Sequence, residues 1–142
     1  MDLLENLKST FQIEQAPLNT YSPLTLAFLG DCVFEIIIRT VVVERANRQT
    51  CVLHQKKSKI VNAGTQARLI EVMLPFLTEE EAAVYRRGKN AKVISPAKNA
   101  DIKDYRKATG LEALCGYMFL KDDMERLIML IKNGLDQLKI VI

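Results

Sequence analysis

The sequence lacks the segments that mark secreted and membrane-spanning proteins. Its most apolar run, residues 32–43, is interrupted by Glu35 and Arg39 and is shorter than the roughly 20 apolar residues that cross a bilayer. The N-terminus has neither a basic start nor an apolar stretch after it, so no signal peptide is expected. These absences predict a cytoplasmic protein without a membrane partner.

Histidine and cysteine are also scarce, which argues against a zinc site or a framework of disulfides. The chain has one histidine and three cysteines. Cys51 and His54 lie close together, but no second pair follows to complete a tetrahedral zinc site. Cys32 and Cys115 lie in apolar segments, where a thiol behaves as a small apolar side chain. We therefore expect reduced thiols in the core.

Sustained alternation of apolar and polar residues, the signal of a β-strand, is nearly absent, whereas helix signals recur. Ser22 and Pro23 supply an N-cap and a first-turn proline for a helix over 24–43. This helix is apolar on most sides and is therefore expected to be central and buried. Further helices are expected over 52–74, 79–88, 102–120 and 123–138, with a loop over 89–100. The prediction is an all-α helical bundle, a single domain over 1–142 with its core at about 20–138.

One segment carries most of the positive charge. Residues 86–107 hold eight basic and two acidic side chains, whereas the whole chain has a net charge of only +3. Such a block favours a polyanionic partner, although a solvated basic loop has the same composition. The basic residues of this segment are Arg86, Arg87, Lys89, Lys92, Lys98, Lys103, Arg106 and Lys107.

Two acidic residues interrupt apolar helical segments that are about 80 residues apart. Asp31 follows Gly30, and Glu112 lies between Gly110 and Gly116. A glycine in a helix interior costs about 1 kcal/mol relative to alanine and is usually kept where another backbone or a ligand approaches closely. A carboxylate in apolar surroundings needs a partner, and two of them from distant helices suggest one shared cation. The alternative is that each carboxylate pairs with a lysine or an arginine.

These two motifs resemble a known enzyme family. Phe28-Leu29-Gly30-Asp31 is similar to the signature helix of the ribonuclease III catalytic domain, and residues 111–116 are similar to its second acidic motif. The basic segments 87–92 and 96–99 resemble the loop of its compact bacterial branch, Mini-ribonuclease III, which has no separate RNA-binding domain. With the charge of this segment, the resemblance implies RNA binding by Arg86, Arg87, Lys89, Asn90, Lys92, Lys98 and Asn99. The resemblance implies the ribonuclease III fold and a Mg²⁺-dependent endoribonuclease. In such an enzyme Asp31 and Glu112 are the catalytic, metal-binding residues.

The same resemblance implies the partners of the chain. It implies double-stranded RNA as the substrate, in particular the precursor of 23S ribosomal RNA, and leaves open assistance by a ribosomal protein. Because a duplex has two strands and this chain has one acidic pair, we expect a two-fold symmetric homodimer. In the family, the residue that matches Phe28 packs into the second subunit at the dimer contact. The alternative for Phe28 is an ordinary core position.

The chain departs from the family pattern where ribonuclease III has further acidic residues. The positions concerned are Leu24, Ala27 and Thr109. Asp101 and Asp104 precede Glu112 by about 16 and 12 Å along a continuous helix, too far to share its cation. We therefore expect one firmly held Mg²⁺, with water completing its coordination.

Other functions are compatible with these residues. The missing acids allow a non-catalytic RNA-binding module that keeps the fold. The basic segment alone also suits a helical protein that binds an acidic protein partner. Residues 54–58 suit contact with an RNA backbone and equally a solvated helix start. The sequence also leaves open whether Glu35, one helical turn after Asp31, ligates metal or pairs with a basic residue.

Overall fold

Helices make up the regular secondary structure in the part of the chain that this computed structural model describes, residues 3–91 and 101–142. The α-helices are α1 (Leu3–Phe11), α2 (Pro23–Arg45), α3 (Thr50–Ser58), α4 (Ala63–Met73), α5 (Glu79–Lys89), α6 (Ile102–Leu120) and α7 (Met124–Gln137). Short 3-10 turns, η1 (Leu18–Thr20) and η2 (Leu74–Phe76), precede α2 and α5. The predicted all-α class is confirmed.

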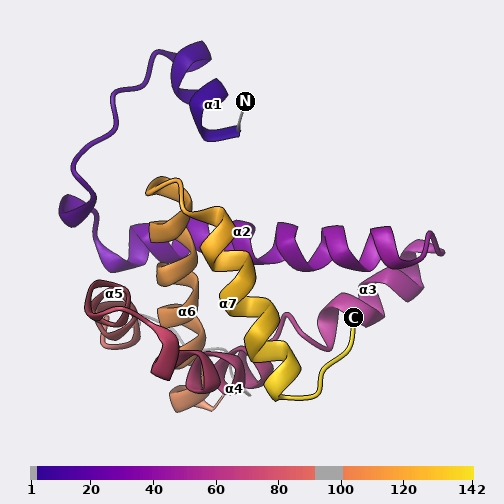
Figure 1. Ribbon diagram of the computed structural model, residues 1–142. Helices are drawn as coiled ribbons and strands as arrows, with labels where there is room; N and C mark the ends of the chain where they lie inside the picture. The colour runs from indigo at the N-terminus through magenta and orange to yellow at the C-terminus, as the bar shows by residue number, and fades with distance from the viewer. Residues whose placement is uncertain (1–2, 92–100) are drawn as a thin grey trace.

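Helix α6 is the centre of the bundle. It packs against α2, α4, α5 and α7, and its Leu111, Leu114 and Met118 are completely buried. Each buried apolar side chain of this size contributes about 1.5–3 kcal/mol relative to an exposed one. Figure 1 shows α2 lying across one end of α6, so that one side of α2 faces the core and the other faces away from it.

Local sequence sets the helix ends much as the caps predict. The Ser22 hydroxyl accepts a hydrogen bond from the backbone N–H of Thr25 at 3.2 Å and so starts α2. Thr78 and Glu81 form a reciprocal capping box at the start of α5. Asp101 caps α6. These three helices, and α7 after them, lie close to their expected ranges.

The expected single helix over 52–74 is wrong, because the chain breaks it into α3 and α4. Asn62 lies at the break and binds both sides of it. Its Oδ1 accepts a hydrogen bond from the backbone N–H of Thr65 at 2.9 Å, and its Nδ2 donates one to the carbonyl of Ser58 at 2.9 Å. Because its side chain takes the place of hydrogen bonds that a continuous helix would make, this asparagine stabilises the break between α3 and α4.

Helix α2 is not buried on all sides, contrary to the expectation. Phe34 and Ile38 are buried, whereas Phe28 is 83% exposed and Ile36 is 63% exposed. The core position weighed for Phe28 is therefore wrong. Cys32 is exposed as well, so the expected core thiol is found only at Cys115. The helix carries apolar residues around its whole circumference, but its neighbours cover only one face of it.

Helix α1 is the element that sequence patterns do not predict. It buries none of its residues, and Figure 1 shows it apart from the other helices, joined to them by an irregular segment. Among the described residues, no helix combines the length and apolar character that crossing a membrane requires.

Candidate active site

Helices α2 and α6 cross at a point where neither has room for a side chain. A Cβ atom on Gly30 would lie 1.6 Å from the backbone oxygen of Glu112, and one on Gly116 would lie 2.1 Å from the backbone oxygen of Leu26. The two backbones therefore touch. This close approach, expected from the glycines, brings Asp31 next to Glu112.

The carboxyl groups of Asp31 and Glu112 interact directly. Asp31 is exposed on α2, whereas Glu112 is partly buried on α6. Burial, a hydrogen bond with the Asp31 side chain and the negative charges of Asp31 and Glu35 together raise the pKa of Glu112 to about 8. In the absence of a cation, Glu112 therefore keeps its proton at neutral pH.

The described part of the chain offers this pair no basic partner. The ion pairs found there use Glu35, Glu71, Glu81 and Asp136 instead. The alternative that Asp31 and Glu112 each pair with a lysine or an arginine is therefore wrong for residues 3–91 and 101–142. The same residues form no cluster of three or more histidine, cysteine or acidic side chains suited to a metal. Among the described residues, a cation held here would therefore find two carboxyl side chains as ligands, with water for the remainder.

Glu35 has a different environment, although it lies only one turn after Asp31. Its Oε1 accepts hydrogen bonds from Lys57 Nζ at 2.6 Å and from Arg39 at 2.7 Å (Nη2) and 3.0 Å (Nε). Lys57 and then Arg39 hold the pKa of Glu35 below its usual range. Glu35 thus pairs with basic residues. Its spacing to Arg39 on the same helix is visible in the sequence, but Lys57 comes from α3 and no local pattern points to it.

The positions where the resemblance implies further acidic residues hold none here, and the hydroxyl of the residue at one of them, Thr109, is satisfied within its own helix. Thr109 is buried, and its hydroxyl donates a hydrogen bond to the carbonyl of Tyr105 at 3.0 Å. Helix α6 runs from Ile102 to Leu120 without interruption. Asp101 and Asp104 therefore keep the separation from Glu112 of about 16 and 12 Å along the helix axis that the sequence indicates.

The predicted RNA-binding residues that the structure describes lie together at the end of α5. Arg86, Arg87 and Asn90 line one hollow of about 500 Å³, beside Pro23 at the start of α2. Lys89 Nζ lies 6.0 Å from the ring centre of Tyr85. Three further predicted residues lie outside the described part of the chain. They are Lys92, Lys98 and Asn99.

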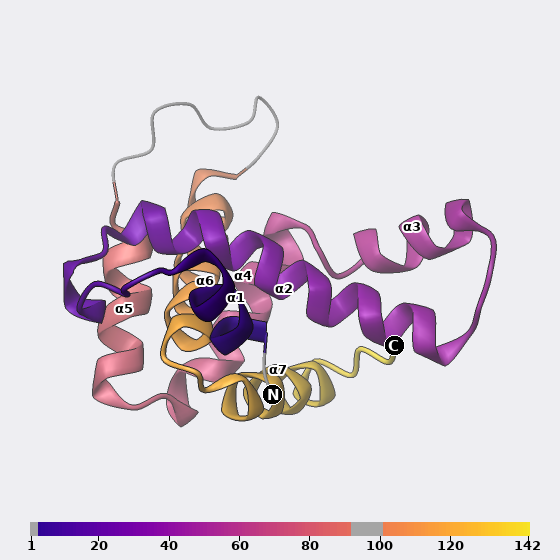
Figure 2. The same cartoon turned by 90° about the horizontal axis from the view of Figure 1, so that it is seen from above.

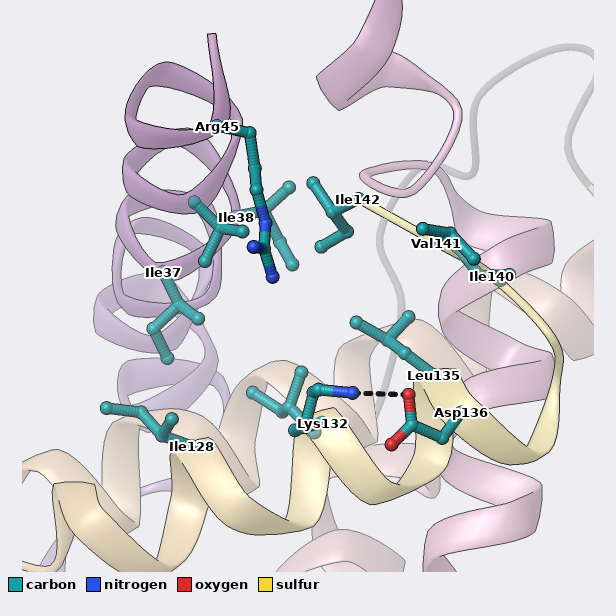
Figure 3. A pocket seen from close by; sticks show the side chains of 12 residues that line it. Ile37, Ile38, Arg45, Ile128, Lys132, Leu135, Asp136, Ile140, Val141 and Ile142 are labelled. Carbon is teal, nitrogen blue, oxygen red and sulfur yellow. Dashed lines mark hydrogen bonds and ion pairs between the residues drawn. The ribbon is translucent and has the colours of Figure 1, made fainter.

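A cavity lined mostly by apolar residues lies between α2, α7 and the C-terminal residues. It has a volume of about 330 Å³ and is walled mainly by isoleucines, including Ile37, Ile128 and Ile142 (Figure 3). Two charged residues in its wall, Lys132 and Asp136, form an ion pair with each other (Figure 3). Neither Asp31 nor Glu112 lines this cavity. The unneutralised acids thus mark the α2–α6 crossing, rather than this cavity, as the candidate active site.

Comparison with known proteins gives consistent matches along most of the chain. Residues 24–123 match the ribonuclease III domain family. A Mini-ribonuclease 3 of Clostridium tetani is 46% identical over 112 residues, which cover 78% of this chain and 74% of the relative. A Mini-ribonuclease 3 of a Thermoanaerobacter species is 39% identical over 121 residues, covering 85% of each chain.

The fold also matches a solved structure. A crystal structure of a protein from Fusobacterium nucleatum superimposes with a TM-score of 0.76 at 28% identity. The match covers 87% of this chain and 98% of the other.

Proposed function

Because this chain belongs to the ribonuclease III family, within its Mini-ribonuclease 3 branch, we propose that it cuts double-stranded RNA with a Mg²⁺ ion held by Asp31 and Glu112. Membership of the family makes it an endoribonuclease. The observation that carries the proposal is the pair itself. Two carboxyl groups from distant helices meet, and no basic side chain among the described residues neutralises them.

The donor set fits a hard divalent cation. Carboxylate oxygens are ligands that Mg²⁺ prefers, and this ion usually keeps several waters. A cation also offsets the repulsion that contributes to the raised pKa of Glu112, so cation binding and loss of the proton go together. When bound, the ion supplies a polarised water and offsets the negative charge that develops on the phosphate. Asp31 and Glu112 orient it by their position at the helix crossing.

Basic side chains of α5 bind and orient the RNA in this proposal. Arg86 and Arg87 present planar guanidinium groups that suit phosphate oxygens, and the Asn90 amide donates hydrogen bonds beside them. An A-form duplex is recognised mainly through its shape, phosphates and 2′-hydroxyl groups, which such side chains can reach. Lys89 adds a nearby positive charge. The predicted set also includes Lys92, Lys98 and Asn99, which lie outside the described residues.

We propose a homodimer formed through the exposed face of α2. Phe28 is 83% exposed and Leu24, one turn before it, is 43% exposed. Exposed apolar residues that gather on one helix face are typical of a protein interface. A two-fold symmetric dimer would carry one Asp31–Glu112 pair for each strand of the duplex.

The precursor of 23S ribosomal RNA is the substrate that we propose. Its maturation would take place in the bacterial cytoplasm, where a ribosomal protein bound to the precursor is the partner to test for stimulation of cleavage. In this proposal residues 1–142 act as one catalytic domain.

A cleavage assay tests this proposal. Purified protein is incubated with a labelled RNA duplex and with its single strands, in Mg²⁺ and in chelator. We expect Mg²⁺-dependent cutting of the duplex alone, and no cutting by Asp31→Asn. Asp136→Asn makes the same chemical change in an exposed aspartate on α7 and should cut normally. Cutting by Asp31→Asn would exclude this residue from the mechanism. Binding of a natural precursor hairpin without cutting would favour a non-catalytic RNA-binding module.

A further inference from the structure

A hollow between α2 and α3 gathers three basic side chains from two helices. It has a volume of about 110 Å³, and Arg39, His54 and Lys57 line it together with apolar residues of both helices. Figure 2 shows α3 running back alongside the C-terminal half of α2, at the opposite end of that helix from α5. This hollow is therefore separate from the basic surface of Arg86 and Arg87.

Glu35 holds two of the three basic groups in place. A single carboxylate oxygen, Oε1, accepts one hydrogen bond from Lys57 and two from Arg39. One negative charge thus fixes two positive charges, and the cluster keeps a net positive charge. The ammonium group of Lys57 has three N–H donors and makes one hydrogen bond within the described residues, the one to Glu35. The Lys57 side chain is 18% exposed, so it is largely covered by the protein but still reaches solvent.

The cluster adjoins the candidate active site. Glu35 follows Asp31 by one turn of α2, and its charge is close enough to act on the carboxyl group of Glu112. Along α2, Asp31 lies about 12 Å from Pro23, where the Arg86–Arg87 hollow begins, and about 12 Å from Arg39. The acidic pair therefore lies midway between two basic surfaces.

We propose that Arg39, His54 and Lys57 form a second phosphate-binding site, which holds the RNA backbone on the α3 side of the Asp31–Glu112 pair. This inference rests on the proposed function, because it takes RNA as the polyanion. The ligand is a phosphate of the RNA backbone, bound through N–H donors and positive charge. In this arrangement Lys57 is the main contact, and Glu35 competes with the phosphate for its N–H donors. A strand that crosses the acidic pair is then held on both sides of the phosphate to be cut.

A purely structural role for the same cluster makes different predictions. Helix α3 buries none of its residues, so the Lys57–Glu35 ion pair is one of the contacts that join α3 to α2. If Lys57 served only this purpose, Glu35→Gln and Lys57→Gln would break the same ion pair and have the same consequences. If Lys57 also binds phosphate, the two substitutions affect RNA binding in opposite directions, because one removes a positive charge and the other a negative charge.

The test measures binding of an uncleaved RNA duplex in chelator over a range of salt concentrations. Lys57→Gln should weaken binding and reduce the slope of log affinity against log salt by about 1, the value for one lost phosphate contact. Lys56→Gln is the matched control, because Lys56 is the preceding residue and lines a different hollow with Arg45 and Ile142. It should leave the slope unchanged, and Lys57→Arg should retain the wild-type slope.

Glu35→Gln completes the set. It should bind the duplex as tightly as the wild type or more tightly, while its melting temperature falls as much as that of Lys57→Gln. An unchanged slope for Lys57→Gln would overturn the inference, as would equal losses for Lys56→Gln or for Glu35→Gln. Because chelator prevents cleavage, these results stand apart from the cleavage assay. A wild type that binds through Lys57 but never cuts keeps this site and refutes the proposed activity. A wild type that does not bind the duplex refutes both.

Discussion

Two glutamates of this protein, Glu81 and Glu112, lie in opposite electrostatic environments. The side chain of Glu81 is 2% exposed, and it accepts hydrogen bonds from Arg126 at 2.6 and 2.8 Å and from the backbone N–H of Thr78. The Arg126 side chain is the main cause of the lowered pKa of Glu81. Glu112 meets another acid, Asp31, and its pKa is raised to about 8.

The contrast distinguishes an acidic residue that stabilises the fold, Glu81, from one that we propose binds a cation, Glu112. Glu81 caps α5 and ties it to α7, and both of its oxygens have donors within the chain. The described residues provide Glu112 with a like charge and no ion pair, an arrangement that costs stability unless a cation arrives from outside. Enzymes commonly keep such costly arrangements at active sites.

The largest effect is expected from separating the two helices that create the acidic pair. Gly30→Ala places a methyl group against the backbone of Glu112. A helix backbone cannot move aside as a flexible side chain can, so the two helices must separate. We expect a loss of stability of about 3 kcal/mol and loss of cleavage. Gly64→Ala is the control, because its nearest neighbours would lie at 3.5 and 3.8 Å and α4 gains a better helix former. Urea denaturation measures both, and equal effects would contradict the tight crossing.

Exchanging the two glutamates for glutamine should separate activity from stability. We expect Glu112→Gln to reduce the cleavage rate about a hundredfold or more, the scale for losing one preorganised charge at a reacting group. The fold should be retained, because glutamine is uncharged and has the same shape as the protonated Glu112 side chain that lies next to Asp31. Single-turnover cleavage of a labelled duplex measures the rate. Wild-type cleavage by Glu112→Gln would show that the acidic pair is not catalytic.

The reverse is expected for Glu81→Gln. This change leaves Arg126 without its anionic partner and should reduce stability by about 2 kcal/mol, the cost of a partly buried charged group that loses its hydrogen bonds. Cleavage measured well below the melting temperature should be unchanged. A stable Glu81→Gln protein with impaired cleavage would reverse the roles that we assign to the two acids.

The last effect concerns stability alone, through its dependence on pH in the metal-free protein. Folding raises the pKa of Glu112 from 4.5 to about 8, so its contribution is favourable at low pH and is lost as the pH rises through this range. Folding lowers the pKa of Glu81, so its contribution is present above the ordinary carboxyl range and is lost as the pH falls through the lowered pKa.

Melting temperatures measured between pH 3 and pH 9 should therefore fall toward both ends, by on the order of ten degrees on the alkaline side. We expect Glu112→Gln to flatten the decline between about pH 5 and pH 8, and saturating Mg²⁺ to do the same in the wild type. Glu81→Gln should flatten only the acid side. An alkaline decline that survives in Glu112→Gln would mean that another group causes it.

The elements that the sequence predicts best are those with a local chemical cause. Ser22, Thr78 and Asp101 cap their helices through their own side chains, so the starts of α2, α5 and α6 can be predicted. The break at Asn62 escapes prediction because the same residue type is also tolerated within helices. Helix α1 escapes prediction because it buries none of its residues and so does not belong to the core that the apolar pattern predicts.

The candidate site shows the same division. Asp31 and Glu112 can be paired from the sequence because the glycines beside them indicate a close helix crossing. The exposure of Phe28 and the link from Glu35 to Lys57 depend on which faces the tertiary fold leaves open and which helices it brings together. Spacing along the chain contains neither piece of information.

The most direct test of the central claim is a titration of the metal-free protein with Mn²⁺, which takes the place of Mg²⁺. Electron paramagnetic resonance measures how much Mn²⁺ is bound. The wild type should bind one ion firmly per chain, and Asp31→Asn and Glu112→Gln should lose it. Glu81→Gln should bind as the wild type does, although it is less stable. Equal binding by all four proteins would contradict the claim that the unneutralised acidic pair is the cation site.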